Sequence, residues 1–203
     1  GHVVDMLLEQ RAIAKANKCI VSISGDFPRW HANGLIVRNG QEYRQKPITS
    51  DLCVLYSNGV METYEAKTIS PEEILASDPW QSWHFGPELL DHNGQPKTRF
   101  NTTVGGRNPR AVIGYYEPGH YCLVLVDGRQ RSGRYSMGLT LLELAQLAHD
   151  LGCTQAYNLD GGNSASLVFK RRDENGNLKY EKLNMPERER DLADMVCFVS
   201  LVK

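Results

Sequence analysis

Apolar and polar positions recur along the chain with two different spacings, which predict a mixture of helices and strands. Apolar residues lie at helical spacing among charged ones in residues 5–16 and again from Thr140 to Gly152. The second segment begins with Thr140 and Glu143, the pattern of a capping box, and ends at a glycine typical of a helix C-cap. A third, short helix is predicted after Ser70, because proline and two glutamates follow it.

Strands are predicted where short apolar runs lie between turn residues. Two hairpins are indicated, one around Asn39-Gly40 and one around Ser57-Asn58-Gly59. Asn-Gly is the preferred sequence of the type I′ turn that joins antiparallel strands. The predicted strands cover residues 19–24, 34–38, 41–44, 51–56, 60–64, 111–116, 121–126, 154–159, 166–169 and 194–202. This alternation predicts an α+β fold, in which helices pack on a mixed, twisted sheet with several hairpins.

Length and composition favour a single domain that covers residues 1–203. The formal net charge of -1 and the scattered basic residues leave no positive surface for a nucleic-acid backbone. The longest apolar stretches are far shorter than the roughly 20 residues that a membrane-spanning helix needs. We therefore expect no nucleic-acid partner and no membrane span, and the oligomeric state stays open.

The cysteines and histidines do not form a recognisable metal-binding pattern. Five cysteines, at positions 19, 53, 122, 153 and 197, each lie in or beside an apolar run and never in a Cys-x-x-Cys pair. Free cysteine is among the most buried residue types, so we expect all five to be unpaired and buried. The histidines lack paired ligand spacing, and the glycine-rich motifs of nucleotide-binding loops are absent. We expect neither a metal nor another cofactor.

The turn from Asn158 to Ser164 concentrates polar groups between two apolar runs. Gly161 and Gly162 remove two side chains where a strand ends, which allows positive φ angles and lets a ligand approach the backbone amides. This arrangement predicts a shallow cradle for an anion or a sugar. Glycine pairs also occur in plain turns, so the motif alone leaves both interpretations open.

Two aspartates, Asp127 and Asp160, each follow a predicted strand and precede a glycine. If the two strands are neighbours, both carboxylates lie on one rim, as cleavage of a glycosidic bond requires. Asp-Gly is equally a common turn dipeptide. Arg110 begins an apolar strand after the long loop of residues 91–110, a position from which its guanidinium can bind a phosphate bidentately.

Several other residues are candidates for a surrounding role. Arg129 and Ser136 belong to a glycine-rich polar segment that we interpret as a lid or as a solvated loop. His84 follows Trp83 in a pattern typical of a partly buried histidine. Trp80 and Trp83 fit either core packing or a stacking platform for a sugar ring.

Seven sequence blocks, in order, together resemble the phosphodiester glycosidase family. They span nearly the whole chain, and the resemblance implies an α+β fold and hydrolysis of a sugar-1-phosphodiester at the glycosidic C1–O bond. The sugar released would be similar to N-acetylglucosamine, and the substrate a phosphorylated glycan. The blocks are ISGDF (23–27), GLIVRNG (34–40), WHFGPELLD (83–91), NPRAVIG (108–114), VLVDGRQ (124–130), GLTLLELA (138–145) and NLDGGNSASL (158–167).

The resemblance and the residue patterns together assign roles. Asp160 attacks or supports the oxocarbenium ion that develops at C1, and Asp127 positions water or a sugar hydroxyl. Arg110 holds the phosphodiester together with backbone amides near Gly161 and Gly162. The predicted substrate-binding residues are Asp26, His84, Arg129, Ser136, Asn158, Gly161, Gly162, Asn163 and Ser164.

The chain departs from the family pattern in two places, which leaves the choice of substrate open. Ser24-Gly25-Asp26 stands where many members have Asn-Gly-Gly, and Asn163 stands where another glycine is frequent. Members usually carry further strands before the first helix, so we expect that this chain is either a trimmed product or lacks one edge of the sheet. Members are often bacterial and linked to exopolysaccharides, which favours a location outside the cell or at its surface, whereas unpaired cysteines favour a reducing compartment.

Two other functions are compatible with the same residues. One is a glycan-binding module without catalytic activity, which keeps the cradle and the aromatic residues. The other is a metal-assisted phosphodiesterase in which Asp26, Asp127 and Asp160 are oxygen ligands.

Overall fold

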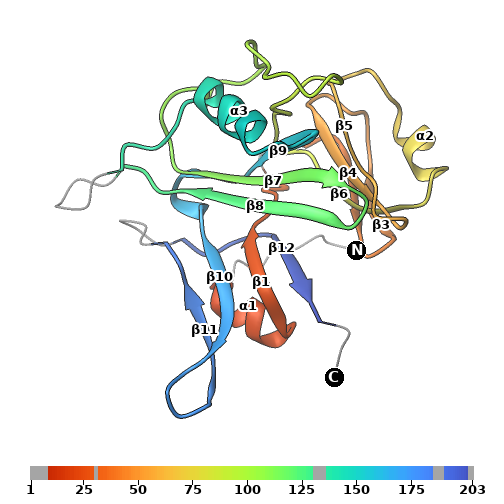
Figure 1. The fold of residues 1–203 in the computed structure, drawn as a ribbon. Coiled ribbons are helices and arrows are strands. Elements are labelled where there is room, and N and C mark those ends of the chain that lie inside the picture. Colours follow the sequence, from red (N-terminus) through yellow and green to blue (C-terminus); the bar gives the residue numbers. More distant parts are fainter. Residues whose placement is uncertain (1–8, 30–31, 130–135, 185–189, 201–203) are drawn as a thin grey trace.

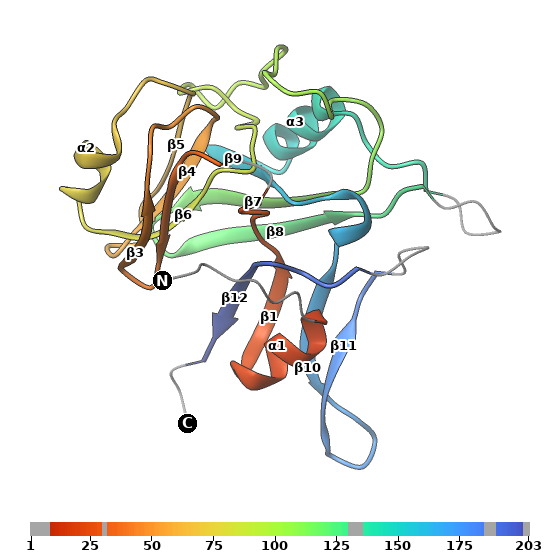
Figure 2. The same ribbon diagram turned by 180° about the vertical axis from the view of Figure 1, so that it is seen from behind.

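The computed structural model describes residues 9–29, 32–129, 136–184 and 190–200. Its strands form three antiparallel sheets, which Figures 1 and 2 show from opposite sides. The predicted α+β class is confirmed, although the strands divide among three sheets where one mixed sheet was expected. None of the described helices has the length and apolar character needed to cross a membrane.

The first sheet brings the two halves of the sequence together. Its strand order is β11-β10-β1-β12. The helix α1 (Gln10–Ala16) packs against this sheet through Ala14, which lies beside Cys19 and Val168. The strands are β1 (Cys19–Ser24), β10 (Leu167–Arg172), β11 (Leu178–Lys182) and β12 (Met195–Val199).

A disulfide between Cys19 and Cys197 links β1 to β12, with the two Cα atoms 5.7 Å apart. The expectation that all five cysteines are unpaired is therefore wrong for this pair. Sequence spacing did not indicate the bond, because the two residues are 178 positions apart and become neighbours only when β1 and β12 pair.

The second sheet has the order β3-β2-β6-β4-β5 and contains both predicted hairpins. Asn39 and Gly40 have φ angles of 53° and 74°, as a type I′ turn requires. The short helix α2 (Pro71–Leu75) begins with the capping box of Ser70 and Glu73. The strands are β2 (Leu35–Arg38), β3 (Gln41–Gln45), β4 (Leu52–Tyr56), β5 (Met61–Tyr64) and β6 (Pro79–Trp83).

Strand β6 was not predicted, and its position settles the role of two aromatic residues. It pairs with β2 on one side and β4 on the other. Trp83 is buried in the main hydrophobic core, whereas Trp80 is 44% exposed and packs beside Gly40. The two indole rings therefore do not form a common platform for a sugar.

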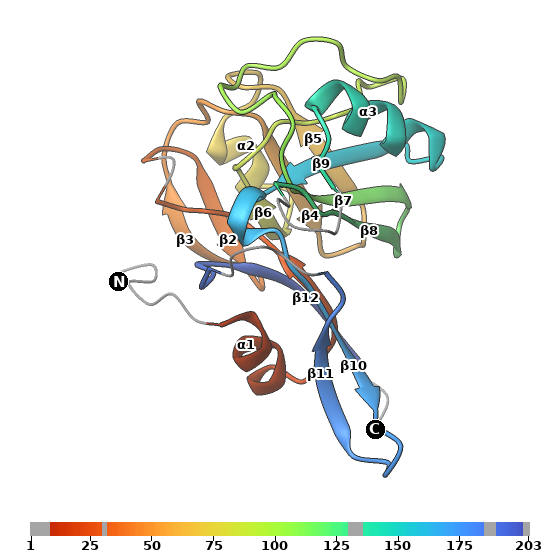
Figure 3. The same ribbon diagram turned by 90° about the vertical axis from the view of Figure 1, so that its left-hand side faces the viewer.

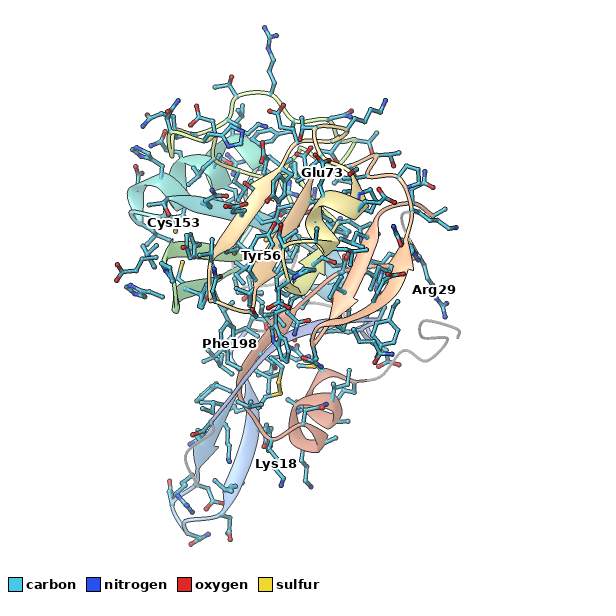
Figure 4. All side chains as sticks on the ribbon, turned by 90° about the vertical axis from the view of Figure 1, so that its right-hand side faces the viewer. Lys18, Arg29, Tyr56, Glu73, Cys153 and Phe198 are labelled. Carbon is cyan, nitrogen blue, oxygen red and sulfur yellow. A yellow bond between two sulfur atoms is a disulfide. The ribbon has the colours of Figure 1, made fainter. Side chains whose placement is uncertain are left out.

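The third sheet, β8-β7-β9, carries the longest strand and meets both other sheets in the main hydrophobic core. It consists of β7 (Arg110–Glu117), β8 (His120–Val126) and β9 (Gln155–Leu159). Helix α3 (Leu141–Asp150) covers one face, with its apolar side chains in the core that includes Val112 and Ala156. On the opposite face, Tyr121 and Phe198 lie with ring centroids 6.1 Å apart, and Figure 4 shows Phe198 where the first and third sheets meet.

One connection between sheets matters most for function. The chain leaves the third sheet at the end of β9 and enters the first sheet at β10, as Figure 3 shows. The turn between these strands contains the 3-10 helix η1 (Gly162–Ser164). The polar turn identified in the sequence therefore lies at the junction of two sheets.

Candidate functional site

A cavity of about 180 Å³ lies at this junction, and we call it the junction cavity. Six of the predicted site residues line it: Arg110, Arg129, Asp160, Gly161, Gly162 and Asn163. Five further residues complete its lining: Phe27, Phe85, Val104, Asn108 and Arg190.

The strand arrangement places Arg110 between the two predicted aspartates. β8 and β9 are not neighbours, because each pairs with a different side of β7. Asp127 and Asp160 therefore follow strands that end at the same edge of the sheet, with Arg110 at the start of the strand between them. Asp127 does not line the junction cavity, and its Oδ1 accepts a hydrogen bond of 3.1 Å from Asn184.

The Asp160 carboxylate is largely buried at the wall of the cavity. Its side chain is 12% exposed, and burial raises its pKa from 3.8 to about 6. Ser164 and Arg190 oppose this rise, and Arg190 Nη2 lies 3.2 Å from Oδ2. The backbone is fixed as well, because the Asp160 amide donates to the Gly25 carbonyl and Ser24 Oγ donates to the Asp160 carbonyl, each over 2.8 Å.

Ser164 supports this carboxylate from behind and does not line the cavity. It is buried, and its hydroxyl lies close enough to Asp160 to lower the pKa of that residue. Its orientation falls short of a well-formed hydrogen bond with any described residue. The predicted substrate contact of Ser164 is thus replaced in this structure by a contact with Asp160.

Arg110 is a buried cation that no described carboxylate neutralises. Its Nε donates to the Leu139 carbonyl over 3.0 Å, and its Nη2 donates to the carbonyls of Val104 and Gly106. Burial, together with the nearby Arg129, lowers its pKa to about 10. Among the described residues, Nη1 has no hydrogen-bond acceptor. An anion in the cavity would therefore relieve an unfavourable arrangement of charge.

Two more guanidinium groups make the cavity positively charged. Arg129 donates from Nε to Asn108 Oδ1 over 3.1 Å, and Nη2 donates to the same oxygen. The Arg190 guanidinium lies 5.0 Å from the centre of the Phe27 ring. The described lining thus holds three arginines and one aspartate, which suits a phosphate group better than a neutral ligand.

The glycine pair is needed for packing as well as for access. A Cβ atom on Gly161 would lie 2.5 Å from the Pro109 carbonyl oxygen, and the Gly162 amide donates to that oxygen over 2.9 Å. The Gly162 amide is therefore not available to a phosphate, which corrects the expectation for this group. The amides of Gly161 and Asn163 donate to no described residue and remain candidates for binding an anion.

Asp26 and His84 form a buried pair behind the cavity. His84 Nδ1 lies 2.8 Å from Asp26 Oδ2, and the His84 amide donates to the same oxygen over 2.9 Å. Burial would raise the pKa of Asp26, but His84 and Arg38 lower it to about 2. Neither member lines the cavity, whereas Phe27 and Phe85, which follow them in the chain, do. The pair positions the cavity wall.

The remaining predicted residues also lie outside the cavity lining. Asn158 Nδ2 donates to the Gly86 carbonyl over 2.7 Å and so holds the segment that follows Phe85. Ser136 Oγ donates to the Asp127 carbonyl. Residues 130–135, which carry most of the proposed lid, fall outside the described residues, so the lid stays a prediction.

Some of the cavity residues that were not predicted lie in recognisable sequence motifs, and others do not. Phe27, Phe85 and Asn108 lie inside the blocks that carry the family resemblance, beside or near residues chosen from them. Arg190 lies in a polar stretch without a motif, and it meets Asp160 only through the fold. The described part of the chain contains no cluster of three or more His, Cys, Asp or Glu side chains placed to bind a metal ion.

Two further cavities adjoin the junction cavity through shared lining residues. A second cavity of about 410 Å³ shares Phe85 and Val104 with it. A third, of about 630 Å³, shares Asp51, Phe100 and Asn101 with the second. The second and third cavities together form a groove along residues 97–104, which carry two charged side chains, hydroxyl and amide groups and one aromatic ring, that of Phe100.

Comparisons with known proteins agree with the sequence blocks. A model of the phosphodiester glycosidase family matches residues 17–199. The SPbeta prophage-derived uncharacterized protein YomE of Bacillus subtilis (strain 168) is 27% identical over 170 residues. That match covers 78% of this chain and 26% of YomE, so the chain spans about a quarter of this relative.

One solved structure shows the same fold over nearly the whole chain. The catalytic domain of zebrafish N-acetylglucosamine-1-phosphodiester alpha-N-acetylglucosaminidase, auto-inhibited by its pro-peptide, matches with a TM-score of 0.72 and 22% identity. The match covers 96% of this chain and 68% of the zebrafish chain. A hypothetical protein from Synechocystis matches with a TM-score of 0.48 and 16% identity, over 86% of this chain and 51% of that one.

Proposed function

This chain belongs to the phosphodiester glycosidase family, and we propose that it hydrolyses a sugar-1-phosphodiester at the glycosidic C1–O bond. One observation carries the proposal: the buried Asp160 and Arg110 share a positively charged cavity at the junction of two sheets. A cation for the phosphate and a carboxylate for the sugar carbon are the two groups that this cleavage needs.

The arginines act on the leaving side of the bond. When the C1–O bond breaks, negative charge develops on the phosphate oxygen. Arg110 is fixed by three carbonyls and needs little reorganisation to stabilise that charge, and Arg129 adds a second guanidinium. Because a phosphate monoester leaves readily, the reaction needs little help from a general acid.

Asp160 acts on the sugar side. In its ionised form the carboxylate stabilises the positive charge that develops at C1, and its burial strengthens this interaction. Since burial places its pKa at about 6, the carboxylate is charged above that pH. Activity is therefore expected to fall as the pH drops below about 6, because Asp160 becomes protonated.

The groove is the proposed site for the part of the substrate beyond the phosphate. Hydroxyl groups of Ser50 and Thr102 and the ring of Phe100 line its middle part and suit a glycan, and a sugar similar to N-acetylglucosamine is the proposed released product. The Cys19–Cys197 disulfide supports a location in an oxidising compartment, outside the cell or at its surface.

The test is hydrolysis of UDP-N-acetylglucosamine and of a methyl phosphodiester of N-acetylglucosamine, with products identified by mass spectrometry. We expect free sugar from the wild-type protein and at least a hundredfold loss in Asp160→Asn and Arg110→Ala. Asp173→Asn, in the distant turn between β10 and β11, is the matched control. Near-wild-type turnover by folded Asp160→Asn protein would contradict the proposal.

The same assay distinguishes the alternatives. Binding without release of sugar would indicate a glycan-binding module. Sugar phosphate as the product, together with loss of activity in EDTA, would indicate a metal-assisted phosphodiesterase.

A further inference from the structure

The thiols of Cys122 and Cys153 face each other on the α3 side of the third sheet. Cys122 lies on β8, and Cys153 lies in the short connection between α3 and β9. Their Sγ atoms are 3.6 Å apart, about 1.5 Å more than in a disulfide. Figure 4 shows Cys153 at the edge of the sheet, where the next residue, Thr154, donates from its amide to the Tyr115 carbonyl over 2.8 Å.

Gly114, on the central strand β7, provides the space in which the two sulfurs meet. It lies directly across from Cys122 in the sheet. A Cβ atom at this position would lie 2.6 Å from Cys122 Sγ and 2.7 Å from Cys153 Sγ. The φ angle of Gly114 is not in the left-handed region, so the backbone does not require glycine here. Glycine inside a strand weakens it and often marks a close approach, and here the approaching atoms are the two sulfurs.

The two thiols differ in ways that give each a role in forming a bond. Cys122 is partly exposed, whereas Cys153 is 5% exposed. The hydrogen bond with Cys153 lowers the pKa of Cys122 to about 6, and Tyr116 and His120 contribute in the same direction. That same bond, followed by burial, raises the pKa of Cys153. Cys122 is therefore the accessible thiolate, and Cys153 is the thiol that follows it.

We propose that Cys122 and Cys153 form a second disulfide by exchange with a low-molecular-mass disulfide such as glutathione disulfide. The Cys122 thiolate attacks one glutathione sulfur, the glutathione S–S bond breaks, and one glutathione thiolate leaves. The Cys153 thiolate then attacks the Cys122 sulfur and displaces the second glutathione. The two protein sulfurs lose two electrons, glutathione disulfide gains them, and the two cysteine protons pass to the released glutathione.

This bond would anchor both ends of a segment that reaches the junction cavity. The segment runs from β8 through Arg129 and α3 to the start of β9. The bond would join β8 to the connection that precedes β9, above Gly114 of the central strand β7. The proposal does not depend on the catalytic function.

The experiment equilibrates the full chain with glutathione disulfide, denatures it, alkylates the free thiols and maps the peptides without reduction. With both disulfides formed, one thiol, that of Cys53, remains for alkylation, and with the Cys19–Cys197 bond alone three remain. We expect one alkylated thiol and a peptide pair linked through Cys122 and Cys153. Alkylation of both residues in protein that retains the Cys19–Cys197 bond would overturn the proposal.

Variants test the mechanism separately from the bond. Cys153→Ser is expected to trap one glutathione on Cys122, whereas Cys122→Ser is expected to leave Cys153 unmodified. Gly114→Ala is expected to abolish the linked peptides, and Gly105→Ala, which has no atom within 4 Å of the added Cβ, is the matched control. Linked peptides at the wild-type level in folded Gly114→Ala protein would contradict the role assigned to Gly114. Absence of the glutathione adduct in Cys153→Ser would contradict the order of attack.

Discussion

Replacing Asp160 by asparagine should make the protein more stable at alkaline pH while it removes activity. Burial raises the pKa of Asp160 from 3.8 to about 6, so the folded state disfavours the charged carboxylate. Each pKa unit corresponds to about 1.4 kcal/mol, and the cost of keeping this group ionised is therefore about 3 kcal/mol. The side chain is 12% exposed, so solvent screening reduces this figure little.

The size of this effect depends on pH, whereas its sign does not. Above about pH 6 the carboxylate is ionised in both the folded and the unfolded chain, and the full cost is present. As the pH falls from about 6 to 3.8, the folded state takes up a proton first and the cost disappears. The asparagine side chain of the variant is neutral throughout, so Asp160→Asn should exceed wild type by about 2 to 3 kcal/mol near pH 8 and by almost nothing near pH 4.

Urea unfolding, followed by tryptophan fluorescence at both pH values, measures this difference. Asp127→Asn is the matched control, because Asp127 also follows a strand at the same edge but is only partly buried and accepts a hydrogen bond from Asn184. We expect no stabilisation in the control. Equal stability of Asp160→Asn and wild type near pH 8, or the same gain at both pH values, would refute the reasoning.

Three further predictions concern the structure around the site. His84 and Arg38 hold the pKa of Asp26 at about 2 against the effect of burial, so the charge of Asp26 stabilises the fold by roughly 2 kcal/mol above pH 3.8. This contribution is lost as the pH falls through about 2. Asp26→Asn should therefore unfold at a lower urea concentration than wild type near pH 7, and an unchanged midpoint would contradict this. Reduction of the Cys19–Cys197 bond, which spans 178 residues, should lower the free energy of unfolding by up to about 5 kcal/mol. Thermal unfolding of the reduced and the oxidised protein measures this difference, and no change would show that the bond does not constrain the unfolded chain. Gly161→Ala should lower the free energy of unfolding by about 1 to 3 kcal/mol, because its Cβ would lie 2.5 Å from a carbonyl oxygen. Gly106→Ala, with open space around the added Cβ, should leave the stability nearly unchanged. Equal effects of the two substitutions in urea unfolding would contradict the predicted steric clash.

The sequence predicted local structure well because its signals act over a few residues. Asn39-Gly40 sets a turn by its own φ preferences, and Thr140 with Glu143 caps a helix within one turn. Strand β6 escaped prediction because its pairing partners, β2 and β4, come from separate hairpins. Its central position in the second sheet is a tertiary property that no local pattern encodes.

The candidate site was predictable only in part, for the same reason. Arg110 and Asp160 were found because Arg110 begins a strand and Asp160 follows one, and such positions meet where antiparallel strands pair. Asp26 and His84, predicted to bind substrate, instead contact each other across 58 positions of the sequence. In the structure this pair supports the cavity wall. No sequence motif indicated Arg190, because it reaches Asp160 only after the chain has folded back to the cavity.

In the proposed reaction the oxygen of water becomes bonded to the sugar carbon C1 and not to phosphorus. Hydrolysis of a methyl phosphodiester of N-acetylglucosamine in ¹⁸O-labelled water tests this directly, with the methyl phosphate product analysed by mass spectrometry. Cleavage at C1–O predicts free sugar and methyl phosphate without label. Labelled phosphate, or sugar phosphate as the product, would show attack at phosphorus and contradict the account.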